Sequence, residues 1–182
     1  MNKIEFRKRQ HKILKDFSLT KQKAIQDQKL CTKFLNSTCL KRAHKVGITI
    51  SMPEEVDTQP IIYAIKALGK SVYIPRCLSE HKMEFTKFSD VHQLTRTKFG
   101  TSEIWSKDAE VDNDLDLIVV PLLAFEMEKH YRLGFGGGYY DRFLKNFSGE
   151  TICLLNEKQV YPSSLWSIDD FDVPIQKYIL AK

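Results

Sequence analysis

The sequence has little cysteine and no long hydrophobic run, and both shortages restrict what the protein can be. Its four cysteines, Cys31, Cys39, Cys77 and Cys153, lie far apart and form no CxxC pair. This pattern argues against a zinc site and a disulfide framework, and it favours the reducing cytosol. The longest apolar run, LIVVPLLAF at 117–125, contains a proline and is far shorter than a membrane span. The basic start of the chain is not followed by the apolar region of a signal peptide, so we expect a soluble, cytoplasmic protein with no membrane partner.

Acidic residues are scarce near the start of the chain. Residues 1–45 hold 13 Lys and Arg against 3 Asp and Glu, whereas the remainder holds more acid than base and brings the net charge to +5. A basic arm of this kind attracts polyanions, either nucleic acid or a phosphate-bearing small molecule. A lysine-rich, solvated helix face explains the same excess equally well, so charge alone leaves these alternatives open.

Apolar patterning predicts alternating strands and helices. Helices are expected over 3–17, 21–36, 57–70 and 139–146, and strands over 46–51, 71–75, 83–88, 115–121, 151–155 and 177–180. The order strand, helix, strand over 46–75 is a βαβ unit, which implies parallel pairing, while 83–88 is either an edge strand or a hairpin arm. We therefore expect a single domain over residues 1–182. It is an α/β fold of three layers, α/β/α, with a largely parallel central sheet, and the basic helices of residues 1–45 pack on this α/β core.

Glycine is also scarce, and half of it lies in one place. Four of the eight glycines fall between 134 and 138, in the stretch RLGFGGGYYDRFL at 132–144. This stretch does not fit GxGxxG, because Tyr139 stands where the last glycine belongs. It does not fit GxxxxGK[ST] either, because none of its glycines precedes a lysine. The two common phosphate-binding loops are therefore excluded.

The stretch nevertheless has the features of an anion site. Glycine allows positive φ and brings bare backbone N–H groups close to a ligand, and a helix starting near Tyr139 would add its own free N–H groups. Arg132 and Arg142 bracket the loop, and Asp141 would suit a magnesium ion that bridges to phosphate oxygens. The alternative is a tight turn without a ligand, in which Asp141 favours the helix N-terminus and Tyr139 and Tyr140 pack in the core.

RLGFGGGYYDRFL resembles the signature of the 5-formyltetrahydrofolate cyclo-ligase family, also called 5,10-methenyltetrahydrofolate synthetases. Further segments resemble that family in the same order along nearly the whole chain, namely KIEFR, SMPEEVDTQPII, VYIPR, LDLIVVPLLAFE, NEKQV and DVPIQKYIL. Two positions depart from it. The family often has proline after the glutamate where Ile104 follows Glu103, and it commonly has histidine where Phe171 precedes Asp172.

The resemblance implies an ATP- and Mg²⁺-dependent enzyme of one-carbon metabolism that acts as a monomer. It implies the cyclisation of 5-formyltetrahydrofolate, with or without a polyglutamate tail, to 5,10-methenyltetrahydrofolate with release of ADP and phosphate. ATP activates the formyl oxygen as a formyl-phosphate-like intermediate, and nitrogen 10 then attacks the activated carbon. Phosphoryl transfer depends on positioning and charge neutralisation more than on a covalent nucleophile, and the chain shows no Ser-His-Asp or Cys-His arrangement.

The resemblance also assigns site residues. It places ATP contacts on Lys3 and Arg7 and on the run Arg132, Leu133, Gly134, Phe135, Gly136, Gly137, Gly138, Tyr139 and Tyr140. It places folate contacts on Met52, Asp57, Phe135, Gly136, Gly137, Gly138 and Tyr139. Arg132 and Asp141 are the candidate catalytic residues, and Asp141 and Asp172 are the candidate Mg²⁺ ligands. Lys3 and Arg7 are one helical turn apart, so they share a stripe of the first helix.

Several of these residues have a structural alternative. Asp57 is also a good helix N-cap, Met52 could equally line the core, and Arg76 could either reach a glutamate tail or form an ion pair. Two rival functions remain. One is another ATP-dependent enzyme on the same scaffold, which would differ around Met52 and Asp57. The other is a nucleic-acid-binding module that uses the basic helices, although the sequence has no RNP-type aromatic motif or DNA-reading helix pair, so we expect no nucleic-acid partner.

Overall fold

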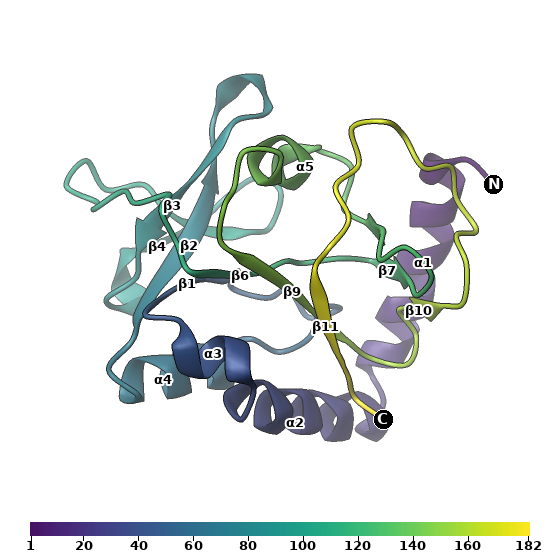
Figure 1. The fold of residues 1–182 in the computed structure, drawn as a ribbon, viewed down its shortest axis with the longest axis horizontal. Helices are drawn as coiled ribbons and strands as arrows, with labels where there is room; N and C mark the ends of the chain where they lie inside the picture. Colours follow the sequence, from purple (N-terminus) through teal and green to yellow (C-terminus); the bar gives the residue numbers. More distant parts are fainter.

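The computed structural model describes residues 1–182 and places a six-stranded sheet at its centre (Figure 1). In spatial order the strands are β11 (Lys177–Leu180), β9 (Glu150–Leu155), β6 (Leu117–Val119), β1 (Lys45–Gly47), β2 (Ser71–Cys77) and β3 (Met83–Lys87). All neighbouring pairs are parallel except β2 and β3, which are antiparallel. The predicted largely parallel sheet is confirmed, and the segment expected at 83–88 is both an edge strand and a hairpin arm.

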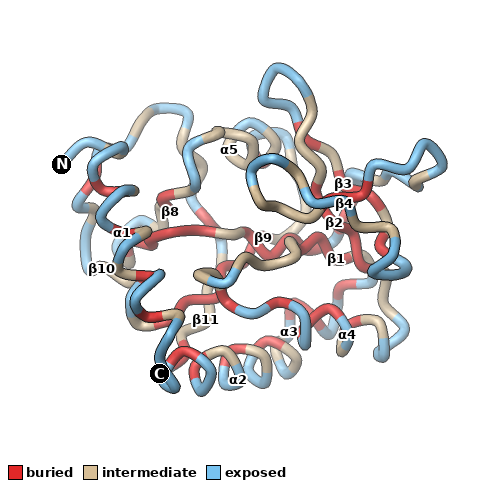
Figure 2. Tube along the Cα trace, turned by 180° about the vertical axis from the view of Figure 1, so that it is seen from behind, coloured by how far each residue is buried: buried red, intermediate tan, exposed pale blue.

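Helices cover both faces of this sheet, which confirms the three-layer prediction. The helices α2 (Lys21–Leu35), α3 (Thr38–Arg42) and α4 (Gln59–Ala67) lie on one face, and α5 (Tyr139–Leu144) lies on the other (Figure 1). α4 buries three isoleucines against the sheet, namely Ile61, Ile62 and Ile65. Figure 2 shows buried residues along the strands, whereas the outer sides of the helices and the long turns are exposed.

The first helix, α1 (Lys3–Ser18), packs on a smaller sheet beside the main one. That sheet contains β10 (Val160–Tyr161), β7 (Ala124–Glu126) and β8 (Arg132–Leu133). The Gln10 amide group is fully buried, donates to the Leu123 carbonyl at 2.9 Å and accepts from the Tyr161 hydroxyl at 2.6 Å. These buried hydrogen bonds hold α1 against the small sheet, whose strand β8 leads into the glycine loop.

Some elements differ from those expected. The strand expected over 46–51 ends at Gly47, because Ser51 exchanges hydrogen bonds with Thr58 instead of continuing a ladder. The glycine loop does not directly follow the strand expected over 115–121. That strand ends at Val119, just before Pro121, which has no N–H for a ladder, and the β7–β8 hairpin intervenes.

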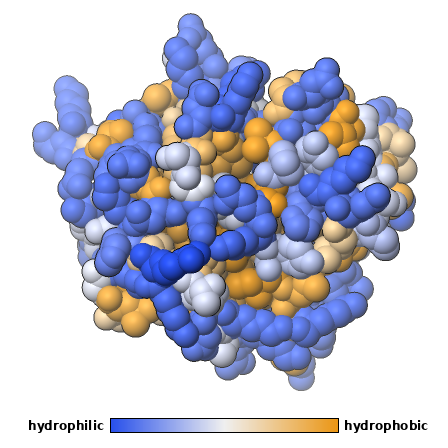
Figure 3. Space-filling model, viewed as in Figure 1, coloured by the Kyte–Doolittle hydropathy of each residue, from blue (hydrophilic) through white to orange (hydrophobic).

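The remaining elements are short. β4 (Leu94–Arg96) and β5 (Ser102–Ile104) form a separate two-stranded ribbon. A left-handed turn, η1 (Ser79–His81), precedes β3, and one turn of 3₁₀ helix, η2 (Val91–Gln93), follows it. Figure 3 shows mostly hydrophilic side chains on one face of the molecule, with small apolar patches between them. Within the structure, every helix is too short or too polar to cross a lipid bilayer.

Candidate active site

The glycine loop, residues 134–138, joins β8 to α5, and its backbone requires its glycines. Gly136 and Gly138 have φ of 107° and 67°, a region that other residues rarely occupy. Gly134 and Gly137 are required for space. A Cβ on Gly134 would lie 2.5 Å from a nitrogen of the Arg132 guanidinium, and one on Gly137 would lie 2.6 Å from the Tyr139 ring. The concentration of glycine therefore reflects a loop folded tightly against its own flanking side chains.

Arg132 and Asp141 form the base of this loop. The Arg132 Nη2 atom lies 3.2 Å from Asp141 Oδ1, and only 3% and 14% of the two side chains are exposed. The same carboxylate oxygen accepts the Val173 N–H at 3.3 Å, so it also ties the loop to the chain that leads into β11. Arg132 Nε is buried without a hydrogen-bond partner. An orphaned donor of a buried cation is unusual in a finished core and is suited to an anionic ligand.

A second group of charged side chains is centred on Lys3 of α1. Its Nζ atom lies 2.6 Å from Asp169 Oδ2 and 2.6 Å from Asp172 Oδ2, and its side chain is only 13% exposed. The Asp169 N–H in turn donates to Asp172 at 2.8 Å. The predicted ATP cation and a predicted Mg²⁺ ligand are thus brought into direct contact.

Arg7 lies between these two groups. Its Nε donates to the Gly134 carbonyl at 2.8 Å, so α1 contacts the glycine loop directly. Burial lowers the pKa of Arg7, and the charges of Asp172 and Asp141 partly oppose that effect. The predicted stripe of Lys3 and Arg7 therefore faces the loop and its carboxylates.

The segment that follows β1 approaches the loop from another side. The Met52 N–H donates to Glu55 at 2.7 Å, and burial raises the pKa of the Glu55 carboxyl to about 7. Burial also raises the pKa of Tyr140, whose hydroxyl has no hydrogen-bond partner, and the Glu55 carboxyl adds to that shift. On α1, His11 joins the two sides, 3.1 Å from Glu54 and with its ring 5.8 Å from the Phe135 ring.

Other predicted contacts are less central. Asp57 is exposed and its Oδ1 accepts the Gln59 N–H at 3.0 Å, so it caps the start of α4, whose N-cap position is Thr58. The ion-pair interpretation of Arg76 is confirmed, because its Nε donates to Glu84 at 2.6 Å. Leu133 is a buried residue of the small sheet, where it packs with Phe6 of α1.

Sequence reasoning missed two acidic residues of this region. Glu55 belongs to the acidic pair Glu54–Glu55 in the segment after β1, and this pair beside the predicted folate contacts Met52 and Asp57 was the available signal. Asp169 had no such signal, because its contact with Lys3 spans 166 positions of the chain.

The two predicted metal ligands can be tested against the chemistry of Mg²⁺. The structure contains no group of three or more His, Cys, Asp or Glu side chains arranged for a metal ion. Mg²⁺ needs no such group, since it keeps several waters and is commonly held by one or two carboxylates together with substrate phosphates. Asp141 and Asp172 fit this requirement, because Asp141 bonds to the N–H of Val173, the residue after Asp172.

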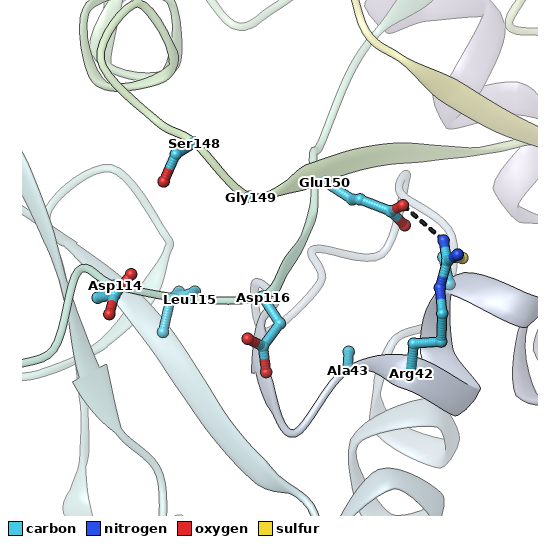
Figure 4. Close-up of a pocket in the computed structure, with 9 residues that line it drawn as sticks. Arg42, Ala43, Asp114, Leu115, Asp116, Ser148, Gly149 and Glu150 are labelled. Atoms are coloured by element: carbon cyan, nitrogen blue, oxygen red, sulfur yellow. Dashed lines mark hydrogen bonds and ion pairs between the residues drawn. The ribbon is translucent and has the colours of Figure 1, made fainter.

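A cavity of about 390 Å³ lies elsewhere, at the end of the main sheet where the parallel strands β1, β6 and β9 begin (Figure 4). Its walls contain residues at the starts of β1, β6 and β9, including Ala43, Asp116 and Glu150, the first residue of β9. Asp116 accepts the N–H groups of His44 and Lys45 at 2.7 and 2.8 Å, and Glu150 pairs with Arg42 at 2.7 Å. These carboxylates hold strand and helix ends together, so they have a structural role. The glycine loop instead faces the segments that follow the carboxyl ends of the strands, which is where ligands bind in open α/β sheets.

Fold and geometry together define a class: an α/β enzyme that gathers cationic side chains, carboxylates and free loop N–H groups at one edge of a parallel sheet. A profile of the 5-formyltetrahydrofolate cyclo-ligase family matches residues 1–179. The chain is 34% identical over 127 residues to a probable 5-formyltetrahydrofolate cyclo-ligase of Schizosaccharomyces pombe, covering 67% of this chain and 62% of that protein. It is 32% identical over 155 residues to the Escherichia coli K12 5-formyltetrahydrofolate cyclo-ligase, covering 81% and 84% of the two chains.

Solved structures agree with the sequence relatives. The NMR structure of Aquifex aeolicus 5,10-methenyltetrahydrofolate synthetase superposes with a TM-score of 0.80 at 27% identity, over 100% of this chain and 91% of that one. The chain therefore belongs to the 5-formyltetrahydrofolate cyclo-ligase family, and it is a ligase of folate one-carbon metabolism. The predicted family, fold and activity are confirmed, whereas the residue roles remain predictions.

Proposed function

We propose that the glycine loop is where ATP and 5-formyltetrahydrofolate react, and that the surrounding charges hold the phosphates of ATP. The observation that carries this proposal is the gathering of three cations: Arg7 bonds to the loop at Gly134, Arg132 pairs with Asp141 at its base, and Lys3 pairs with Asp172. Asp172 precedes Val173, whose N–H bonds to Asp141. Successive loop N–H groups add hydrogen-bond donors for phosphate oxygens. With a divalent cation to take up the neighbouring carboxylates, a site of this composition suits a polyanion.

In this proposal Lys3 and Arg7 contact the polyphosphate from α1, while Arg132 stabilises the phosphoryl group that moves to the formyl oxygen. The transferred group passes through a transition state that depends on positioning and on neutralised oxygens. Nitrogen 10 of the folate then attacks the formyl carbon, the carbon–oxygen bond to phosphate breaks, and phosphate leaves. The chain needs no covalent nucleophile for this sequence.

Asp141 and Asp172 would hold Mg²⁺, which would neutralise charge on the phosphate oxygens. Each carboxylate is paired with a cation in the structure, Asp141 with Arg132 and Asp172 with Lys3. A phosphate group would attract the same two cations, so both carboxylates would become available together. The parallel pairing of both carboxylates with cations that phosphate would bind supports a shared role.

Met52, Glu55 and Tyr140 would form the folate side of the site. Glu55 is half ionised near neutral pH, since its pKa is about 7, and a protonated carboxyl can donate to a folate oxygen or nitrogen. Asp57, at the start of α4, lies further out on the same segment. We also expect the enzyme to act as a cytoplasmic monomer, on the composition and resemblance given above.

An optical assay tests the proposal directly. The protein is mixed with 5-formyltetrahydrofolate, ATP and Mg²⁺, and the near-ultraviolet absorbance of the methenyl product is followed. We expect product only when ATP and Mg²⁺ are both present, with ADP and phosphate formed in equal amounts. A folded sample that forms no ATP-dependent product would overturn the proposal.

A further inference from the structure

The turn between β2 and β3 has a backbone that its residues do not explain. Its two central residues, Glu80 and His81, have φ of 56° and 57°, and the Lys82 N–H donates to the Ser79 carbonyl at 3.2 Å. Two successive left-handed residues are typical of a type I′ turn, which Asn and Gly normally occupy. Histidine is tolerated there better than most residues, but a Cβ still destabilises this conformation.

The side chain of His81 crosses from this turn to the glycine loop. Its Nδ1 atom lies 2.8 Å from the Gly137 carbonyl oxygen, and its ring centroid lies 5.6 Å from that of Tyr139. A carbonyl oxygen only accepts hydrogen bonds, so Nδ1 must carry the proton in this contact. The left-handed turn therefore places a donor on the loop that we assign to ATP.

The hydrogen bond from His81 to the Gly137 carbonyl also affects the direction of the Gly138 N–H. The Gly137 carbonyl and the Gly138 N–H belong to one planar trans peptide, so they point in opposite directions. This peptide is flanked by Gly137 and Gly138, which have no Cβ and do little to limit its rotation. The other donor near the Gly137 carbonyl is Arg142 Nη1, at the longer distance of 3.5 Å. The Gly138 N–H has no acceptor within the chain, and it directly precedes α5.

We propose that His81 is a positioning residue of this enzyme, which holds the Gly137 carbonyl and thereby orients the Gly138 N–H toward phosphate. The proposal rests on the assignment of the glycine loop to ATP.

Three variants separate this role from a structural one. His81→Gly removes the imidazole group and relaxes the left-handed backbone, so it should keep or raise the melting temperature. His81→Asn keeps an N–H donor on a residue that accepts positive φ. Glu80→Gly relaxes the neighbouring position and leaves His81 intact, and it serves as the matched control. The measurements are KM for ATP and for 5-formyltetrahydrofolate, together with hydrogen exchange of the amides of residues 134–138.

We expect His81→Gly to raise KM for ATP roughly three- to tenfold, the effect of one lost hydrogen bond, with a smaller change in KM for the folate. Exchange of the loop amides should become faster. His81→Asn should bring KM for ATP back to within about twofold of wild type, and Glu80→Gly should leave it unchanged. Equal KM values in His81→Gly and Glu80→Gly, an equal rise for both substrates, or no rescue by asparagine would each overturn the proposal. Failure of the wild type to turn over would instead contradict the assignment of the loop.

Discussion

Replacing Glu55 by Gln should stabilise the protein by a margin that grows as the pH rises. Burial raises the pKa of this carboxyl from 4.5 to about 7, although the hydrogen bond from the Met52 N–H favours the ionised form. Between these values the folded protein keeps a proton that the unfolded chain has lost, so the stability of the wild type falls with rising pH. The shift is about 2.5 pH units, and at about 1.36 kcal/mol per unit the folded state loses about 3 kcal/mol by about pH 8.

Urea unfolding of the wild type and Glu55→Gln between about pH 5 and pH 8 measures this difference. The glutamine oxygen can still accept the Met52 N–H, so the substitution removes the ionisation and keeps the hydrogen bond. We expect the variant to exceed the wild type in free energy of unfolding by less than about 1 kcal/mol near pH 5 and by about 3 kcal/mol near pH 8. A difference that stays constant or shrinks as the pH rises would refute the reasoning.

Three further predictions concern the glycine loop and its charges. Asp141→Asn should lower kcat about 100-fold in a protein that still folds, with a lower melting temperature because Arg132 loses its charged partner, and near-normal turnover at every Mg²⁺ concentration would contradict the metal role. Lys3→Met should raise KM for ATP about tenfold, more than it raises KM for 5-formyltetrahydrofolate, and the reverse order in steady-state kinetics would move α1 to the folate side. Gly138→Ala should lower the free energy of unfolding by more than the about 1–2 kcal/mol expected from its left-handed φ alone, because its Cβ would also meet the Arg142 guanidinium. Gly69→Ala, with φ of 72° and nothing near its Cβ, is the matched control in urea unfolding, and equal losses would show that the guanidinium simply moves aside.

Local signals in the sequence were sufficient to predict the main sheet and the position of the glycine loop. The apolar run before Pro121 and the βαβ unit over 46–75 each carry their own pattern, and both are present in the structure. The stripe of Lys3 and Arg7 depends only on helical periodicity, and the structure brings both residues to the loop region. These features could be predicted because neighbouring residues decide them.

The small sheet and part of the site depend on contacts between residues that are far apart in the sequence. β8 and β10 have two residues each, too few to show a period, and β10 pairs with β7 in a register that matches Val160 with Phe125. The raised pKa of Glu55 depends on what packs over it, and the contact of Asp169 with Lys3 crosses almost the whole chain. The sequence pattern contains no local trace of such contacts.

The ion pairs of the site explain how so many charges can be gathered there without a ligand. An uncompensated charge in a poorly solvated position is strongly destabilising. A site for a polyanion and a divalent cation needs both cationic side chains and carboxylates, and without ligands the charges of both are unfavourable. Here Lys3 is held by Asp169 and Asp172, and Arg132 by Asp141, so each sign compensates the other. Under the proposed assignment, phosphate would take up the cations and the carboxylates would then need a new positive partner. Phosphate and Mg²⁺ would therefore enter as one unit, because either one alone would leave half of these pairs uncompensated.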